Sequence, residues 1–313
     1  MGAARERHQR ACERAGDRWL LAYPISHFAA LQVVAQALLS GATLVIPDDF
    51  GPGAALAALA DGVTCLSCTP TYFRRLVLAT PDAAWATTRL AQLTLGGEIV
   101  DQALLDAARR ALPAARIVHI YASTELGAAI TVRDGRAGFD AALLDGERFE
   151  VRDDELWARR SERAMLGYAG GAAPGEWVAT GDLVEVADGR VRFRGRANEI
   201  INVGGFKVSP AEVEAVVREV AGVAEAWVVG HKSSITGQLV KAVLCLAPGA
   251  DAAQVKRDVA ARCAQRLPSH MAPRIFELAE RAETSSTQKL VRRVRDERVP
   301  EGGARLGEER GKR

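Results

Sequence analysis

Apolar runs alternate with helical patterns through the first part of the chain, from Trp19 to about Ile130. This pattern predicts strands at 19–24, 42–46, 64–68, 92–95 and 117–121 and helices at 27–39, 54–60, 70–79 and 101–111. Alternating strands and helices form mostly parallel sheets that are covered by helices. Because ligands of such sheets bind at the carboxyl ends of the strands, the segments 96–98 and 121–125 are candidate site segments.

The pattern changes between Phe149 and Arg194, where short strand-like runs are separated by turns. The pair Asp188-Gly189 lies between two alternating runs, as in a two-residue β-hairpin turn. This region is predicted to form a small antiparallel β subdomain.

A compact α/β unit is predicted after Asn198. Ser209-Pro210-Ala211-Glu212 has the composition of a helix start, with a Ser cap, Pro at the first position and a Glu that reaches back. Strands are predicted at 224–229 and 241–246, and a helix at 251–266. The fold class is therefore α/β: a mostly parallel sheet with flanking helices, a small antiparallel β subdomain and a smaller C-terminal α/β domain.

Three regions are predicted from these changes of pattern. A partial N-terminal core covers residues 1–197, with an α/β layer at 16–140 and the β subdomain at 149–197. The C-terminal domain covers 198–298. The tail, 299–313, is rich in Gly, Glu and Arg, which predicts disorder.

The composition excludes several classes of protein. Of the 313 residues, 48% are hydrophobic and 26% are charged, as in soluble globular proteins. The chain has 41 basic and 39 acidic residues. This balance argues against a nucleic-acid partner, because proteins that bind nucleic acids usually carry a basic stripe. No apolar run reaches the roughly 18 residues of a membrane helix, and the first residues lack the apolar core of a secretory signal. Five cysteines are typical of a reduced compartment, and Cys65 and Cys68 are interpreted as structural. We therefore expect a cytoplasmic protein without a membrane partner.

Four short motifs carry the candidate chemistry. They are Tyr-Ala-Ser-Thr-Glu (121–125), Thr-Gly-Asp-Leu (180–183), Gly-Arg-Ala-Asn-Glu-Ile-Ile-Asn-Val-Gly-Gly (195–205) and the run Thr-Gln-Lys-Leu that contains Lys289. In this order and at these distances they resemble the nucleotide site of the adenylate-forming superfamily, which includes acyl-CoA ligases, non-ribosomal adenylation domains and luciferases. The resemblance extends from about Gly16 to Arg293.

The resemblance implies an adenine and phosphate site around the first motif. Tyr121 would stack on adenine, Thr124 would bind a phosphate oxygen, and Glu125 would hold Mg²⁺, which prefers oxygen ligands. The loop of Gly97 and Glu98 matches the family's small-residue loop against adenine. The ordinary alternatives are an incidental acidic strand end and a simple strand-to-helix turn.

The later motifs imply the rest of the nucleotide site. Asp182 would accept hydrogen bonds from both ribose hydroxyls, and Arg196 would contact the ribose. Lys289 resembles the adenylation lysine, whose ammonium group bridges the substrate carboxylate and the α-phosphate. The alternatives are a hairpin Asp and a surface Lys in a basic tail.

The resemblance also assigns an acyl pocket, a hinge and a thiol tunnel. His27 matches the His beside the acyl pocket, although a core His is an equal alternative. Asn198 stands at the hinge before a C-terminal lid domain that carries Lys289. Gly204 and Gly205 would line the pantetheine tunnel, unless they form only a turn.

The phosphate-binding loop of the family, which should precede residue 16, is not found in this sequence. Three explanations stay open: a fragment of a ligase, one half of a split enzyme whose partner chain brings the loop, or a remnant that binds ligands without activating acids. We expect an AMP-forming enzyme that uses ATP and Mg²⁺ to activate a carboxylic acid, and then transfers it to the pantetheine thiol of CoA or a carrier protein. The alternative is a non-catalytic module that binds AMP, an acyl-adenylate or a carrier protein.

Overall fold

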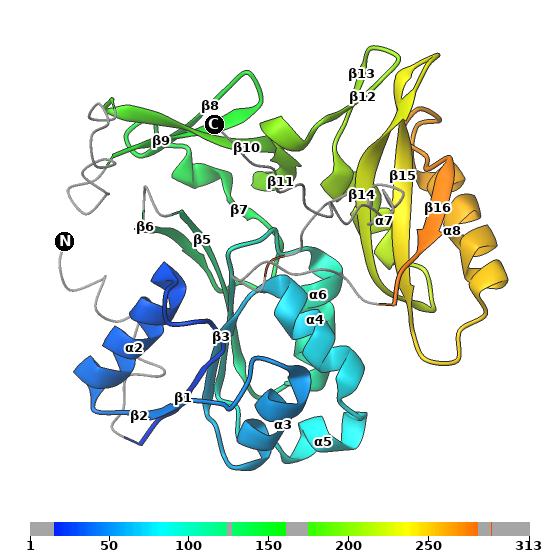
Figure 1. Cartoon of the computed structure of the whole chain (residues 1–313). Coiled ribbons are helices and arrows are strands. Elements are labelled where there is room, and N and C mark those ends of the chain that lie inside the picture. Colours follow the sequence, from blue (N-terminus) through cyan, green and yellow to red (C-terminus); the bar gives the residue numbers. More distant parts are fainter. Residues whose placement is uncertain (1–15, 124–126, 161–174, 281–288, 290–313) are drawn as a thin grey trace, which may run out of the picture.

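The first sheet contains the strands of the predicted α/β layer (Figure 1). The computed structural model describes residues 16–123, 127–160, 175–280 and Lys289. The strand order is β2-β1-β3-β4-β5-β6, in which β1 to β5 are parallel and β6 runs antiparallel to β5. The strands are β1 (Arg18–Leu21), β2 (Thr43–Val45), β3 (Cys65–Cys68), β4 (Gln92–Gly96), β5 (Arg116–Ser123) and β6 (Gly127–Val132).

Helices pack against this sheet and close its main core. They are α2 (Phe28–Ser40), α3 (Pro52–Ala60), α4 (Pro70–Ala79), α5 (Asp82–Thr87) and α6 (Gln102–Ala111). Side chains that follow the strands cap two of them: Thr69 accepts a hydrogen bond from the Tyr72 N–H, and Asp101 accepts one from the Leu104 N–H. The loops after β3 and β4 are thereby fixed at the carboxyl edge of the sheet.

Helix α2 carries apolar residues on two opposite sides. Its sheet-facing side buries Ala30, Val33 and Ala37. Its other side exposes Phe28, Leu31, Leu38 and Leu39, which are 47%, 53%, 75% and 90% exposed. At about 100° per residue the exposed side chains form one stripe. An outward helix face is normally polar, so this stripe is an unusual surface.

The second sheet is antiparallel, as predicted, with the order β7-β11-β10-β9-β8. Its strands are β7 (Phe139–Asp140), β8 (Phe149–Arg152), β9 (Glu155–Arg159), β10 (Trp177–Ala187) and β11 (Arg190–Arg196), and a short 3-10 turn, η1, covers Ala141–Leu143. Asp188 and Gly189 form the two-residue turn between β10 and β11 with φ of 52° and 69°. Two successive positive φ angles are what a type I′ hairpin requires.

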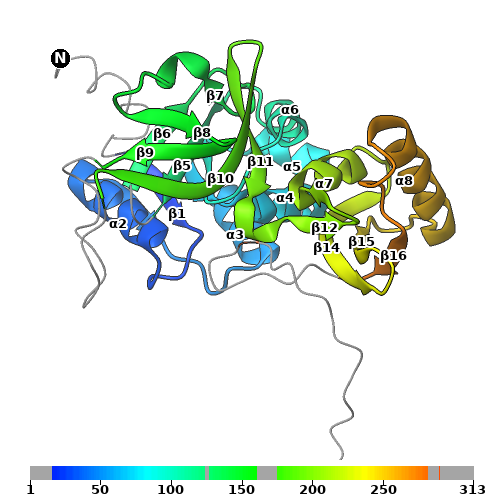
Figure 2. The same cartoon turned by 90° about the horizontal axis from the view of Figure 1, so that it is seen from above.

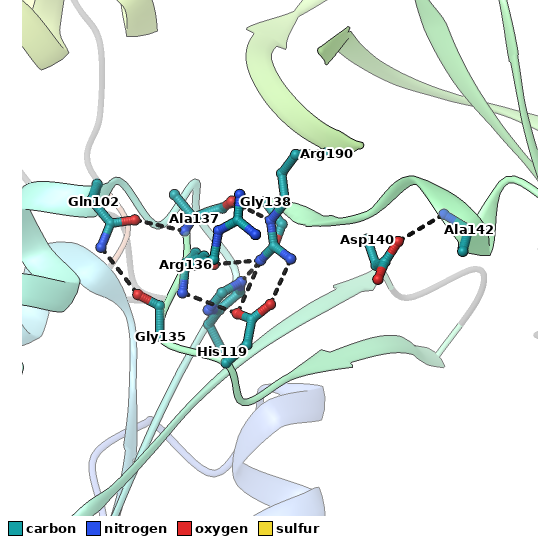
Figure 3. A network of polar contacts seen from close by, with 10 residues as sticks. Gln102, His119, Gly135, Arg136, Ala137, Gly138, Asp140, Ala142 and Arg190 are labelled. Atoms are coloured by element: carbon teal, nitrogen blue, oxygen red, sulfur yellow. Dashed lines mark hydrogen bonds and ion pairs between the residues drawn. The ribbon is translucent and has the colours of Figure 1, made fainter. Parts of the chain in front are cut away.

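A buried arginine joins the second sheet to the segment that leaves the first (Figure 3). The Arg190 side chain is 3% exposed and donates to both carboxylate oxygens of Asp134, at 2.6 and 3.0 Å. It also donates to the carbonyls of Arg136, Ala137 and Gly138. The Gly138 carbonyl lies 2.9 Å from His119 Nε2 on β5. At Gly138 a Cβ atom would lie 2.0 Å from the Val191 carbonyl oxygen, so only glycine fits.

The third sheet belongs to the C-terminal α/β unit (Figure 2). Its order is β13-β12-β15-β14, and β16 pairs in parallel with β15. The elements are η2 (Ala197–Glu199), β12 (Ile201–Val203), β13 (Phe206–Val208), α7 (Pro210–Arg218), β14 (Val223–Ser233), β15 (Gly237–Leu246), α8 (Ala252–Arg266) and β16 (Ile275–Leu278). Apolar residues of α7 and α8 share one core with this sheet.

The predicted start of helix α7 is correct, but the predicted capping is wrong. Ser209 makes no side-chain cap bond; its hydroxyl donates to the Arg194 carbonyl on β11. Glu212 likewise pairs with the Arg194 guanidinium. Both side chains therefore contact Arg194 on β11 instead of capping their own helix.

The other structural expectations have mixed outcomes. Within the described ranges no helix is long and apolar enough to cross a membrane. Cys68, Cys245 and Cys263 are buried free thiols. Cys65 is disulfide-bonded, which corrects the expectation of a reduced cysteine at that position.

Candidate functional site

Three of the predicted residues contact one another between the first and second sheets. The Tyr121 hydroxyl on β5 donates to Asp182 Oδ2 at 2.7 Å. Arg196 Nε lies 3.0 Å from Asp182 Oδ1. Asp182 and Arg196 are paired directly across β10 and β11, which places their side chains on the same face. The register of the hairpin therefore positions the carboxylate and the guanidinium.

Sequence reasoning missed a fourth member of this cluster, Phe193 on β11. Its ring stacks on Tyr121 with a centroid distance of 4.8 Å and an interplanar angle of 28°. The alternation in Arg190-Val-Arg-Phe places Phe193 on the same face as the buried Val191, which was the available signal. The stack holds the tyrosine ring in place on one side.

Asp182 is a buried residue, 8% exposed, and the surroundings of its carboxyl group have opposing effects on its pKa. Burial raises the pKa of Asp182, while the Tyr121 hydrogen bond and the charges of Arg196 and Lys289 lower it. Burial, followed by the Asp182 charge, also raises the pKa of Tyr121, which keeps the phenol a hydrogen-bond donor. The carboxylate retains further acceptor capacity, because its two oxygens offer about four lone-pair sites.

Lys289 lies against Gly97, at the end of β4. A Cβ atom on Gly97 would lie 3.1 Å from Lys289 Cε and 3.7 Å from its Nζ. The residue has φ of 84°, which favours glycine on conformational grounds as well. Because the Lys289 charge also acts on Asp182, the ammonium group and the Asp182 cluster share one region.

Glu98, next to Gly97, makes structural contacts with helix α4. Its carboxylate accepts hydrogen bonds from the Thr71 N–H at 2.8 Å and from the Thr71 hydroxyl at 2.9 Å. A carboxylate at a helix N-terminus is also favoured by the helix dipole. Glu98 therefore ties the loop that carries Gly97 to the start of α4.

The remaining described candidates lie outside this cluster. His27 precedes α2, and its Nδ1 is 3.2 Å from the Pro24 carbonyl. Asn198 is exposed in the short turn η2 between the second and third sheets. Gly204 and Gly205 form the turn between β12 and β13, where the Gly204 N–H donates to the Thr236 carbonyl.

Thr124 and Glu125, the predicted phosphate and Mg²⁺ ligands, lie outside the described residues. In the part of the chain that the structure describes, no group of three His, Cys, Asp or Glu side chains could hold a metal ion. The assignment of Mg²⁺ to Glu125 stays a prediction.

Comparison with known proteins connects both units to one family. The family model of AMP-binding enzymes matches residues 2–156. The model of the AMP-binding enzyme C-terminal domain matches residues 212–289. The two models follow one another in the order that a single enzyme of this family contains.

Individual relatives agree with these models. The 2-succinylbenzoate–CoA ligase of Bacillus licheniformis is 28% identical over an alignment of 299 positions that covers 88% of this chain and 60% of the relative. A fatty acid–[acyl-carrier-protein] ligase of Streptomyces coeruleorubidus is 28% identical over an alignment of 312 positions that covers 90% of this chain and 58% of the relative. The chain thus spans about 60% of the length of these curated relatives.

A solved structure shows the same fold. It is an anthranilate CoA ligase in complex with anthranoyl-AMP, which matches 88% of this chain and 58% of its own with a TM-score of 0.75 at 23% identity. Together with the two family models, this likeness agrees with the order of the sequence motifs and with the α/β fold. The chain belongs to the adenylate-forming superfamily of AMP-binding enzymes.

Proposed function

We propose that the chain carries the adenylate site and the lid of an AMP-forming acid–thiol ligase. The observation that carries this proposal is the convergence of Lys289 with Asp182, Tyr121 and Arg196 at the edge of the first sheet. Relatives that are named as CoA and acyl-carrier-protein ligases support it. Because the chain spans only about 60% of their length, the activity of the whole protein is itself a proposal.

The Asp182 cluster would hold the adenosine part of the nucleotide. Asp182 would accept hydrogen bonds from the two ribose hydroxyls, with Arg196 beside it. The Tyr121 ring, held on one side by Phe193, would stack on adenine with its other side. Gly97 would let the adenine approach the backbone closely, because glycine has no side chain of its own. Together these contacts would bind AMP without contributing to bond making.

Lys289 would act on the reacting groups. A carboxylate oxygen of the acid attacks the α-phosphorus, a P–O bond to the β-phosphate breaks, and pyrophosphate leaves. The Lys289 ammonium would hold the acid carboxylate beside the α-phosphate and stabilise the charge on the transferring group. Thr124 would bind a phosphate oxygen, and Glu125 would hold Mg²⁺, which supplies further charge neutralisation when it is bound.

The second half-reaction would use the C-terminal unit in another orientation. A thiol attacks the acyl carbon of the adenylate, loses its proton, and AMP leaves. Asn198 would be the hinge between the two orientations, and Gly204 and Gly205 would let the pantetheine arm pass close to the backbone. His27 would border the acyl pocket. CoA and a carrier protein are both candidate acceptors, since the relatives include ligases of both kinds.

The phosphate-binding loop would come from further polypeptide, in the same protein or in a partner chain. The apolar stripe on α2 supports an additional layer on that side of the first sheet. The competing function is a non-catalytic module that binds AMP or an acyl-adenylate. The Asp182 cluster supports this alternative equally well, because it needs no phosphate loop.

Pyrophosphate exchange over a panel of carboxylic acids tests the proposal. We expect acid-dependent exchange by the chain, alone or mixed with polypeptide that carries the phosphate loop. Thioester formation from synthetic acyl-adenylates measures the second step separately. AMP binding without either reaction favours the non-catalytic module, and a failure to bind AMP contradicts both functions.

A further inference from the structure

Helix α7 connects the two units at both of its ends. At its N-terminal end, Ser209 and Glu212 contact Arg194 on β11. At its C-terminal end, Arg218 Nη1 lies 3.9 Å from Asp101 Oδ2 at the start of α6. Figures 1 and 2 both show α7 beside the helices of the first sheet. The two contacts differ in what they require of the C-terminal unit.

Arg194 lies only a few residues before the turn η2, at Ala197–Glu199, that joins the second and third sheets. Because Arg194 is so close to η2, its contact with α7 would persist through a wide range of rotations of the C-terminal unit about η2. Arg218 lies about 13 Å from Ser209 along the axis of α7, because an α-helix rises about 1.5 Å per residue. Its contact with Asp101 therefore exists in only one orientation of the C-terminal unit.

Arg218 is held rigidly within its own unit. Its Nη2 donates to Glu214 Oε2 at 3.0 Å and to the Ala226 carbonyl at 2.8 Å. Glu214 is 1% exposed and also accepts the Val228 N–H. Because the guanidinium is fixed in this way, Nη1 faces Asp101 without a further loss of side-chain entropy.

Asp101 is equally fixed on the opposite side. Its Oδ1 caps α6, and its Oδ2 takes the Arg74 guanidinium at 2.5 Å. Burial, and after it the Arg218 charge, lower the pKa of Arg74, so the two guanidiniums face one another across the carboxylate. Asp101 follows Gly97, which Lys289 contacts, by one short loop. The C-terminal part of the chain thus meets the same loop at two points.

We infer that Arg218 and Asp101 are positioning residues that dock the C-terminal unit in the orientation that places Lys289 at Gly97. Without the Asp101 charge, Arg218 would face Arg74 with no carboxylate between them, and like-charge repulsion would favour undocking. The structural part of this inference stands by itself. Its effect on the Lys289-dependent half-reaction rests on the proposed function.

The variant Asp101→Asn tests the inference, because Asn caps a helix as well as Asp does and only the charge is lost. We expect pyrophosphate exchange to fall about threefold to tenfold, with the KM for ATP unchanged and thioester formation from a synthetic acyl-adenylate not reduced. Asp101→Glu should restore most of the exchange. The control, Asp106→Asn on the exposed side of α6, should leave both half-reactions unchanged. Equal losses in both half-reactions would show a merely structural role and overturn the inference.

A distance measurement tests the docking without any activity. Spin labels at Arg110→Cys on α6 and Arg257→Cys on α8 report the separation of the two units by pulsed electron resonance. We expect one narrow distance distribution for the native sequence and Asp101→Glu, and a broadened one for Asp101→Asn. Identical distributions in all three overturn the inference. If the native chain binds no nucleotide yet the Asp101→Asn distribution broadens, the proposed function fails and the docking contact stands.

Discussion

The Asp182 cluster and Lys289 reach the same region of the molecule from two differently built parts. Asp182 and Arg196 lie on the paired strands β10 and β11, and Tyr121, on β5 of the first sheet, donates a hydrogen bond to Asp182. Lys289 follows the third sheet in sequence, and its position depends on how the C-terminal unit docks. Strand register and the packing of the second sheet against the first fix the first group, whereas docking fixes the second. We therefore expect nucleotide binding to belong to the first part and the Lys289-dependent chemistry to need both.

Removing the Lys289 ammonium group should separate the two parts most clearly. Lys289→Ala is expected to lower pyrophosphate exchange about 10²- to 10³-fold, the usual loss for a group that stabilises transition-state charge. The Kd for AMP, measured by calorimetry, should change little, because the Asp182 cluster is intact. Lys232→Ala, at an exposed position on β14, is the control. A large loss of AMP affinity in Lys289→Ala would contradict the division of roles.

Destabilising the second sheet should instead weaken AMP binding, because this sheet carries Asp182 and Arg196. Arg190→Met removes the donors to three backbone carbonyls and is expected to lower the free energy of unfolding by about 2–3 kcal/mol. Since β11 also carries Phe193 and Arg196, AMP affinity should fall with it. Thermal unfolding and AMP calorimetry measure the two effects.

The matched control is Arg192→Met on the same strand. The Arg192 side chain is 42% exposed and lies 3.9 Å from Asp188, so its loss should cost less than about 0.5 kcal/mol. Equal destabilisation by both variants would contradict the special role of Arg190.

The pH dependence of adenosine binding should show that the Asp182 carboxylate contacts the ribose. We expect this effect to be smaller than those of the preceding variants. The ribose hydroxyls donate to the ionised carboxylate, and burial raises the pKa of Asp182 in the folded protein. Affinity for adenosine, which has no phosphate to titrate, should thus be fully present at neutral pH and fall as the pH drops through this raised pKa. Asp182→Asn should bind adenosine about tenfold more weakly at neutral pH and lose this slope. A slope that survives in Asp182→Asn would assign the titration to another group.

The sequence predicted strands β1 to β5 and helices α2, α3, α4 and α6 within a few residues, because each of these strands is a short apolar run between helical patterns. It did not predict β6, which runs antiparallel to β5 at the edge of the first sheet. It missed α5, which has only six residues, and β16, whose pairing partner β15 is distant in sequence. It assigned the wrong partners to Ser209 and Glu212. Local capping rules fail there because both side chains contact Arg194 on a neighbouring strand.

For the site, motif order and spacing selected Tyr121, Asp182, Arg196 and Lys289; the structure brings these four residues to one region, and their roles stay predictions. The same reasoning gave Glu98 a place against adenine, and its contacts with Thr71 become visible only in three dimensions. The sequence did not predict the Phe193–Tyr121 stack or the Arg218–Asp101 contact, because each joins two elements that are far apart in sequence. No local pattern records such contacts.

A crystal structure of the chain with bound AMP tests the convergence most directly. We predict ribose hydroxyls within hydrogen-bond distance of the Asp182 carboxylate, adenine against the Tyr121 ring, and the phosphate on the side of Lys289. AMP bound elsewhere, with Asp182 contacting only Tyr121 and Arg196, would contradict the proposed site.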